Sequence, residues 1–244
     1  MNAAVPSSRA ISTQPIHEPL KTRLLTGSRM TYSRLIGALF MAGFLVYGVG
    51  AAMTSSVTGT PNFLSTLSAH KLVLVIGASL MFMNTLVDVG KGVLFFPVLR
   101  KHSTKTALAY LAALIIEVVL LDTGVVALLM IIPLTGQHAV DAGAATALVH
   151  SNAMAYQFGE MVLAAGCVAL CALLFRTRLI PRWLSISGLI GYPILMAGAI
   201  AEVSGVHIGV VLSIPGMFFE LALPVWLFTR GFQPAAYAAG LGRR

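Results

Sequence analysis

The sequence predicts an all-α membrane protein, a six-helix transmembrane bundle with both termini in the cytoplasm. Three observations predict it: an apolar composition, six long apolar stretches, and a strong bias in the placement of lysine and arginine. The 244 residues are 57% hydrophobic and 10% charged, whereas soluble domains carry about 25% charged residues. The apolar stretches are continuous rather than alternating, which indicates spanning helices and not a β-barrel.

A helix needs about 20 predominantly apolar residues to cross a bilayer. We expect spans at roughly 33–54, 72–98, 106–133, 152–175, 183–203 and 206–229. Residues 1–31 are polar, and the first apolar run begins only after Arg34, so we expect a flexible cytoplasmic tail rather than a signal peptide. The transmembrane domain then covers 32–230, and 231–244 form a short cytoplasmic tail.

The orientation follows from the basic residues, since loops rich in lysine and arginine stay in the cytoplasm. Lys71 lies on the opposite side and Lys91 lies inside the second span. All the others fall on one side: Arg9, Lys21, Arg23, Arg29, Arg34, Arg100, Lys101, Lys105, Arg176, Arg178, Arg182, Arg230, Arg243 and Arg244. We therefore expect a multi-pass protein of the bacterial cytoplasmic (inner) membrane.

The net charge of +8 does not indicate nucleic acid, because the basic residues form short clusters between apolar spans. Such clusters face anionic lipid headgroups at the membrane surface. The predicted partners are therefore membrane lipids, with no nucleic acid, and the sequence does not predict an oligomeric state.

Most of the acidic residues fall inside the predicted spans, where a charge costs about 2.5–3.5 kcal/mol on insertion scales. Their depth can be counted from the basic edges, at a rise of about 1.5 Å per residue. Three of them lie about 15–18 Å deep, near the midplane: Asp88, Glu117 and Glu220. Three others fall in a layer nearer the outer surface: Asp122, Glu160 and Glu202.

Polar residues recur at helical spacing on three spans. The second span carries Asn84, Asp88 and Lys91 on one face, so Asp88 and Lys91 are expected to pair. The fourth and sixth spans carry similar stripes, formed by Asn152, Tyr156 and Glu160 and by Ser213, Gly216 and Glu220. Pro215 and Pro224 bracket Glu220 and are expected to kink that helix.

Two interpretations of these buried charges stay open. In the first they are structural: Asp88 and Lys91 form an internal ion pair, and the glutamates are protonated and hydrogen-bonded. In the second they line a polar cavity that opens outward, because the acids outnumber the single intramembrane cation. The candidate site is then formed by Asp88, Lys91, Glu117, Glu160 and Glu220. The further hypothesis is that Lys91, Glu117 and Glu220 form its floor.

Four histidines map to the outer side: His70, His138, His150 and His207. Imidazole and carboxylate are ligands that suit zinc. However, the sequence has no HExxH motif and no histidines paired at helical spacing. We therefore expect no metal and no cofactor; the residues that would be candidates for a metal site are His150, His207 and Glu202.

Three segments carry a resemblance to a known family. They are Leu94–His102 with the following Tyr110 and Glu117, the Ile-Pro-Arg-Trp segment within 179–191, and Glu220 through Gly-Phe-Gln-Pro ending at 234. In this order the chain resembles the bacterial membrane family named domain of unknown function 4386. The resemblance implies six spans and no established chemistry. It also implies an arginine three positions before Glu117; Leu114 stands there, and Lys91 is the candidate replacement from the neighbouring helix.

Three functions remain open at this point. The leading hypothesis is a non-enzymatic membrane protein that binds or moves a small molecule, ion or lipid through an outward-facing polar cavity. The alternatives are an intramembrane metal-dependent hydrolase that uses the outer histidines and carboxylates, and a non-catalytic, partner-binding membrane subunit. The sequence assigns no catalytic residue.

Overall fold

The computed structural model describes residues 17–60, 63–136 and 142–239, with backbone only for 17–28, 135 and 136. These residues form α-helices and one short 3₁₀ helix, with no strand among them. The elements are α1 (His17–Thr58), α2 (Phe63–Leu99), α3 (Thr104–Leu129), η1 (Ile132–Gly136), α4 (Ala142–Thr177), α5 (Arg182–Val203), α6 (Gly209–Thr229) and α7 (Pro234–Ala239). Six helices in this part of the chain are long and apolar enough to span a membrane, so the predicted fold class is confirmed.

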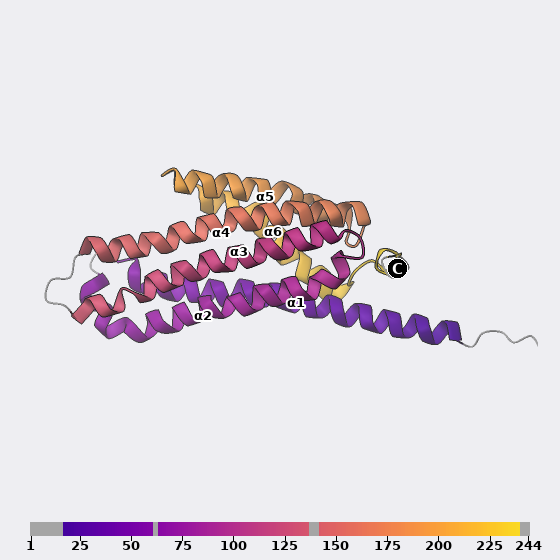
Figure 1. Ribbon diagram of the computed structural model, residues 1–244, viewed down its shortest axis with the longest axis horizontal. Coiled ribbons are helices and arrows are strands. Elements are labelled where there is room, and N and C mark those ends of the chain that lie inside the picture. Colours follow the sequence, from indigo (N-terminus) through magenta and orange to yellow (C-terminus); the bar gives the residue numbers. More distant parts are fainter. Residues whose placement is uncertain (1–16, 61–62, 137–141, 240–244) are drawn as a thin grey trace, which may run out of the picture.

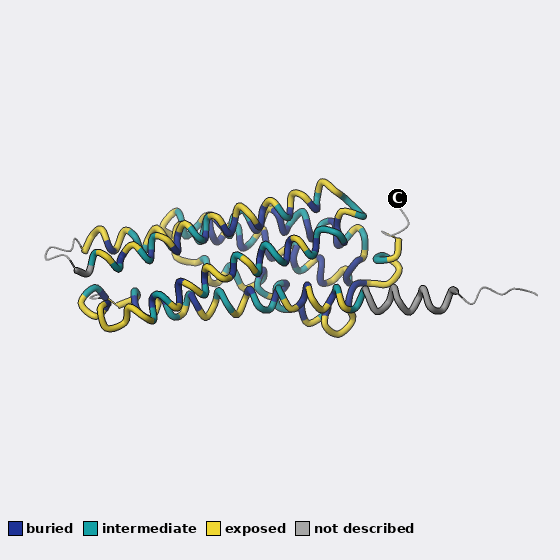
Figure 2. The backbone as a smooth tube through the Cα atoms, turned by 60° about the horizontal axis from the view of Figure 1, so that its bottom comes forward, coloured by how far each residue is buried: buried dark blue, intermediate teal, exposed yellow. Residues whose placement is uncertain are grey.

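The six long helices run side by side along the length of the molecule (Figure 1). Each packs against the next in the chain, and α1 packs against α6, so the six form a closed ring. We call the end with the α2–α3 and α4–α5 connections the inner end, and the opposite end the outer end. Buried residues follow the faces that meet inside the ring, while exposed residues face outward (Figure 2).

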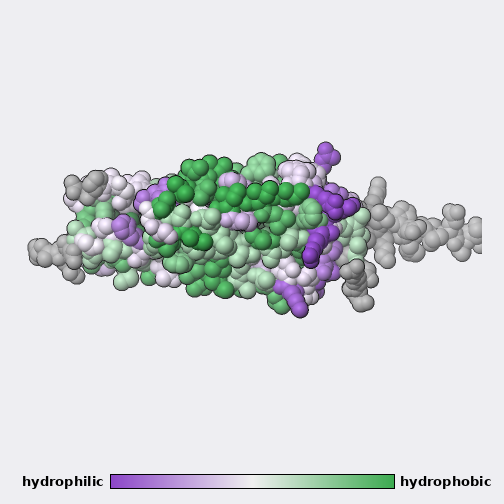
Figure 3. Space-filling model, turned by 90° about the horizontal axis from the view of Figure 1, so that it is seen from above, coloured by the Kyte–Doolittle hydropathy of each residue, from purple (hydrophilic) through white to green (hydrophobic). Residues whose placement is uncertain are grey.

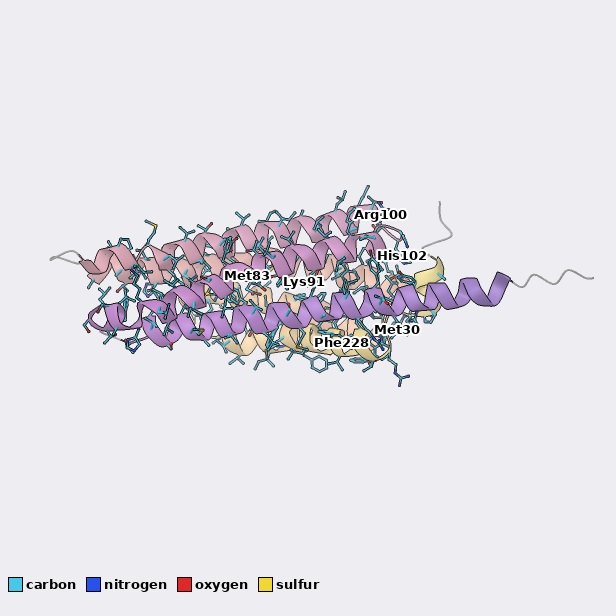
Figure 4. The ribbon with its side chains drawn as sticks, turned by 90° about the horizontal axis from the view of Figure 1, so that it is seen from below. Met30, Met83, Lys91, Arg100, His102 and Phe228 are labelled. Carbon is cyan, nitrogen blue, oxygen red and sulfur yellow. The ribbon has the colours of Figure 1, made fainter. Side chains whose placement is uncertain are left out.

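Hydrophilic side chains gather at the inner end, next to a broad hydrophobic belt (Figure 3). Arg100 and His102 lie at this end, whereas Lys91 lies midway along the bundle (Figure 4). The helices therefore place the basic loops together, as the count along the sequence implies. Which side of the membrane this end faces stays a prediction.

Helices α2 and α4 are clearly longer than the apolar stretches that predict them. Helix α2 begins at Phe63 and α4 at Ala142, about ten residues before the predicted spans. At 37 residues α2 is about 55 Å long, well beyond a core of about 30 Å. Helices α5 and α6 have 22 and 21 residues, close to the thickness of the core. The α5–α6 hairpin therefore ends short of the outer ends of α2, α3 and α4 (Figure 1).

Both predicted tails contain ordered structure. Helix α1 begins at His17, so residues 17–31 are helical, and residues 1–16 lie outside the described part. After α6, Phe232 is fully buried, and its ring stacks on Tyr237. Its amide donates to Ser33 Oγ at 3.0 Å, and the amide of Gln233 donates to the carbonyl of Leu179 at 2.8 Å. Residues 231–239 thus pack against the inner end, and 240–244 lie outside the described residues.

The orientation can be tested with reporters fused into the loops. Fusions after Arg100 and after Arg178 should report the cytoplasm, and fusions within 136–148 should report the outside, because basic loops resist translocation. Paired phosphatase and fluorescent-protein fusions at the same positions provide the measurement and control each other. Signals reversed at these three positions would show that the basic end of the bundle faces outward.

Candidate functional site

A cavity of about 450 Å³ lies inside the ring, and all six long helices contribute to its wall. Its lining combines acidic, aromatic and small residues. On α1 they are Phe40, Gly43, Phe44, Tyr47, Gly48, Ala51, Thr54 and Ser55; on α2 and α3, Met81, Asn84, Asp88, Lys91, Glu117 and Leu121; on α4, Asn152, Ala153, Tyr156, Gln157, Glu160 and Leu163; on α5 and α6, Leu195, Ser213, Met217 and Glu220.

All five predicted site residues line this cavity: Asp88, Lys91, Glu117, Glu160 and Glu220. The predicted stripes on α2 and α4 face it in full. On α6, Ser213 and Glu220 face it, but Gly216 packs against Leu195 of α5 instead. A Cβ at Gly216 would lie 3.0 Å from a methyl carbon of Leu195, so this glycine serves close packing of the two helices.

The charged centre of the cavity is an ion pair on α2. Lys91 Nζ lies 2.5 Å from Asp88 Oδ1, which confirms the predicted pairing. Asn84 Nδ2 donates to Asp88 Oδ2 at 2.5 Å. Lys91 Nζ also lies 4.7 Å from the centre of the Phe40 ring, a cation–π contact from α1. All three polar side chains are buried, so the pair and its amide partner form one rigid unit.

Tyrosine hydroxyls donate to two of the three glutamates. Tyr192 Oη on α5 donates to Glu220 Oε1 at 3.1 Å. Tyr156 on α4 donates to Glu160 one turn further along. The Tyr156 ring stacks on Tyr47 of α1, with ring centres 5.8 Å apart, which fixes the hydroxyl. Each of these glutamates therefore has a partner from an aromatic side chain.

Glu117 on α3 differs from the other acids. Its side chain is only 4% exposed, and its Oε2 atom has no hydrogen-bond partner. The Oδ1 atom of Asn84, whose amide nitrogen already donates to Asp88, is likewise buried without a partner. An unpartnered buried polar atom costs about 1–3 kcal/mol. Both atoms belong to residues that line the cavity, so two acceptors of the lining residues have no donor within the protein.

Glu160 lies at the level of Glu117, and its placement in an outer layer was wrong. Helices α3 and α4 cross closely there, since a Cβ at Gly159 would lie 3.5 Å from the carbonyl oxygen of Glu117. The depth of Glu160 was counted from Arg176 on α4. Because α4 continues to Thr177, past the level at which α3 begins, Arg176 lies closer to the inner end than the start of α3. The count therefore placed Glu160 too far out by about one turn.

The other members of the predicted outer layer are dispersed. Asp122 accepts hydrogen bonds from Thr85 at 2.8 Å, outside the cavity. Glu202 accepts from the amide of Gly209 at 2.8 Å and lies 3.0 Å from His207 Nδ1. It thus holds the first turn of α6, where free amides favour a carboxylate.

Of the three metal candidates, the structure brings together two, His207 and Glu202. His150 is exposed on α4, apart from the His207–Glu202 pair. Across the described ranges no three histidine, cysteine or acidic side chains form a group that could hold a metal ion. His138 lies outside those ranges.

Aromatic rings close the inner side of the cavity. Phe95 contacts Phe40, Tyr110 and Phe232, with ring centres 6.5, 6.1 and 5.6 Å apart. At the outer side, the lining residues Ser55 and Ala153 are exposed. The cavity therefore opens toward the outer end and is closed toward the inner end.

The contribution of α1 was missed by sequence reasoning, because this helix carries no charged residue in its apolar half. The signal is a stripe of small and aromatic residues at spacings of three and four, such as Phe40, Gly43, Tyr47 and Ala51. Gly43 has a definite role: a Cβ there would lie 3.2 Å from Asn84 Oδ1 and 3.3 Å from Asp88 Oδ1. Its lack of a side chain lets the polar unit of α2 approach α1.

Comparison with known families gives one match. The family model described as Domain of unknown function (DUF4386) matches residues 35–231. Comparisons with curated proteins and with solved structures found no match. The matched range includes every charged residue of the cavity. The chain is therefore a member of the DUF4386 family and a multi-pass membrane protein.

Proposed function

We propose that this protein, in the bacterial inner membrane, binds a positively charged small molecule in its outward-facing cavity. The observation that carries the proposal is the pair of free buried acceptors, Glu117 Oε2 and Asn84 Oδ1, in a cavity rich in carboxyl groups. An ammonium group donates hydrogen bonds and accepts none. An ammonium group is therefore the ligand group that complements two hydrogen-bond acceptors that have no donor.

The charges of the cavity favour a cation. Four carboxyl side chains and one lysine line it. Lys91 pairs with Asp88, and tyrosines donate to Glu160 and Glu220, which leaves Glu117 to bind a ligand. Charge-assisted hydrogen bonds are about twice as strong as neutral ones. A bound ammonium would thus satisfy Glu117 and bring the cavity closer to neutrality.

The lining gives no support to the hydrolase alternative. A metal hydrolase needs ligands such as histidines around an open coordination position, and the residues that line the cavity include no histidine. The volume of the cavity lies in the range of about 300–1,000 Å³ that is usual for small-molecule sites. Binding is therefore the function that these residues support best.

The test uses three probes of equal chain length and different charge: butylamine, butanol and butyrate. Each is added to the purified protein in detergent, and the midpoint of thermal unfolding is measured. Butylamine should raise the midpoint in a saturable way, because a ligand at 100 times its Kd stabilises the native state by about 2.7 kcal/mol. Asp122→Asn, which removes a carboxylate outside the cavity, should leave this shift unchanged. Equal shifts from all three probes, or none from butylamine, would overturn the proposal.

A further inference from the structure

We infer that the natural ligand is an amphiphile: its ammonium group binds at Glu117, and its alkyl chain lies in a lateral opening between the outer halves of α1 and α6. The inference rests on the proposed function and adds the class of ligand. It follows from where α1 and α6 touch, where the cavity reaches the surface, and what surrounds that opening.

Helices α1 and α6 pack tightly near the inner end. A Cβ at Gly37 would lie 3.3 Å from both Leu227 Cβ and the carbonyl oxygen of Pro224. Further along, α1 packs against α2 instead: Gly50 meets Gly77 so closely that a Cβ on Gly77 would lie 2.9 Å from the Gly50 carbonyl oxygen. Helix α1 therefore leans from α6 toward α2 as it approaches the outer end.

The cavity reaches the surface where α1 has left α6. Phe44 and Gly48 line the cavity and are also exposed, Phe44 by 40%. No heavy atom lies within 4 Å of the position that a Cβ on Gly48 would take. On α6, Met217 lines the cavity beside the exposed Phe218. These residues place the opening on the side of the bundle.

The opening lies at the depth of the lipid tails. Phe44 and Gly48 follow Arg34 by ten and fourteen residues, which puts them about 15 and 21 Å into a core of about 30 Å. The neighbouring Leu45 and Val49 are exposed by 54% and 51%, as expected for side chains that face lipid. A molecule that occupies this opening therefore has acyl chains, and not water, beside it.

The lining changes character between the opening and the acids. Phe44 and Met217 supply apolar surface near the mouth, while Glu117 and Asn84 supply acceptors deeper in the cavity. An alkyl chain suits the first part and an ammonium group the second. An amphiphile that enters from the surrounding lipid leaflet would bind in this arrangement, with its alkyl chain toward the lipid and its ammonium group in the polar cavity.

The test compares octylamine with butylamine in the wild type and in Gly48→Trp. Butylamine fits within the cavity, whereas the longer chain of octylamine extends into the opening. The tryptophan has free space at position 48 and fills the opening, so octylamine should bind at least tenfold more weakly. Butylamine, whose chain ends short of the opening, should lose clearly less affinity than octylamine in the same variant. Apparent Kd values come from the dependence of the unfolding midpoint on amine concentration, in lipid nanodiscs.

Val49→Trp is the matched control, because it adds the same ring one residue away on the lipid-facing surface and should change neither affinity. Gly48→Leu provides a smaller block if the tryptophan variant does not fold. Unchanged octylamine binding in the folded Gly48 variants, or equal loss of both amines, would overturn the lateral opening. Failure of butylamine to bind the wild type would instead overturn the proposed function, so the two failures are distinguishable.

Discussion

Replacing Lys91 alone by methionine should lower the free energy of unfolding by about 3–5 kcal/mol, the cost of breaking a buried ion pair. Lys91 Nζ lies 2.5 Å from Asp88 Oδ1, and both residues are less than 10% exposed. The substitution leaves Asp88 as a buried carboxylate with only the Asn84 amide as a partner. Methionine keeps the length of the side chain, so the lost charge accounts for most of the effect.

The companion variants separate the pair from its surroundings. Asp88→Asn alone should cost a similar amount, because it leaves the Lys91 ammonium buried without its carboxylate. The double variant should be clearly more stable than the sum of the two single effects implies, since neither charge remains. Chemical unfolding in detergent measures all four proteins, and Lys71→Met, at an exposed outer position, should change stability by less than about 0.5 kcal/mol. Additive effects at 88 and 91 would mean that the two side chains act independently.

The fold was predictable because a bilayer imposes strong constraints on sequence. Apolar length identified six spans, and every one corresponds to a helix. The ends of the helices were not predictable in the same way. The first turns of α2 from Phe63 and of α4 from Ala142 precede the apolar stretches, and a helix that extends beyond the hydrocarbon needs no continuous apolar run. The burial of Phe232 was also missed. In the sequence, an apolar residue that follows a basic membrane edge looks like part of a tail, and only its contacts show that it is packed.

The charged half of the site was visible in the sequence and the neutral half was not. An ionisable residue in hydrocarbon must face protein or a cavity, so Asp88, Lys91, Glu117 and Glu220 could be grouped by depth alone. Gly43 and Tyr47 carry no such penalty, and in sequence they look like any residues of an apolar helix. The level of Glu160 relative to Glu117 depends on how α4 is shifted lengthwise against α3. The residues of either helix alone do not specify this shift.

Glu117→Gln should weaken the binding of butylamine by about 2–5 kcal/mol, the usual cost of removing one partner from a buried charge pair. That corresponds to at least about a 30-fold increase in Kd. The fold should be retained, because the amide has the shape of the carboxyl group and Glu117 Oε2 has no partner to lose. Glu220→Gln is the comparison: its Oε1 already accepts from Tyr192, so its effect on affinity should be smaller.

The dependence of binding on pH distinguishes a ligand-binding carboxylate from a merely structural one. A carboxylate holds an ammonium group only when it is ionised, so wild-type affinity should rise with pH while butylamine remains protonated, and affinity in Glu117→Gln should be nearly flat. Other titratable groups that line the cavity come from the surrounding helices: Tyr47, Asp88, Lys91, Tyr156, Glu160 and Glu220. All of them remain in the variant, so the change can be assigned to position 117. Infrared difference spectra with and without butylamine should show one carboxyl group losing its proton in the wild type and none in the variant. Identical spectra for the two proteins would show that Glu117 is not the group that binds the amine.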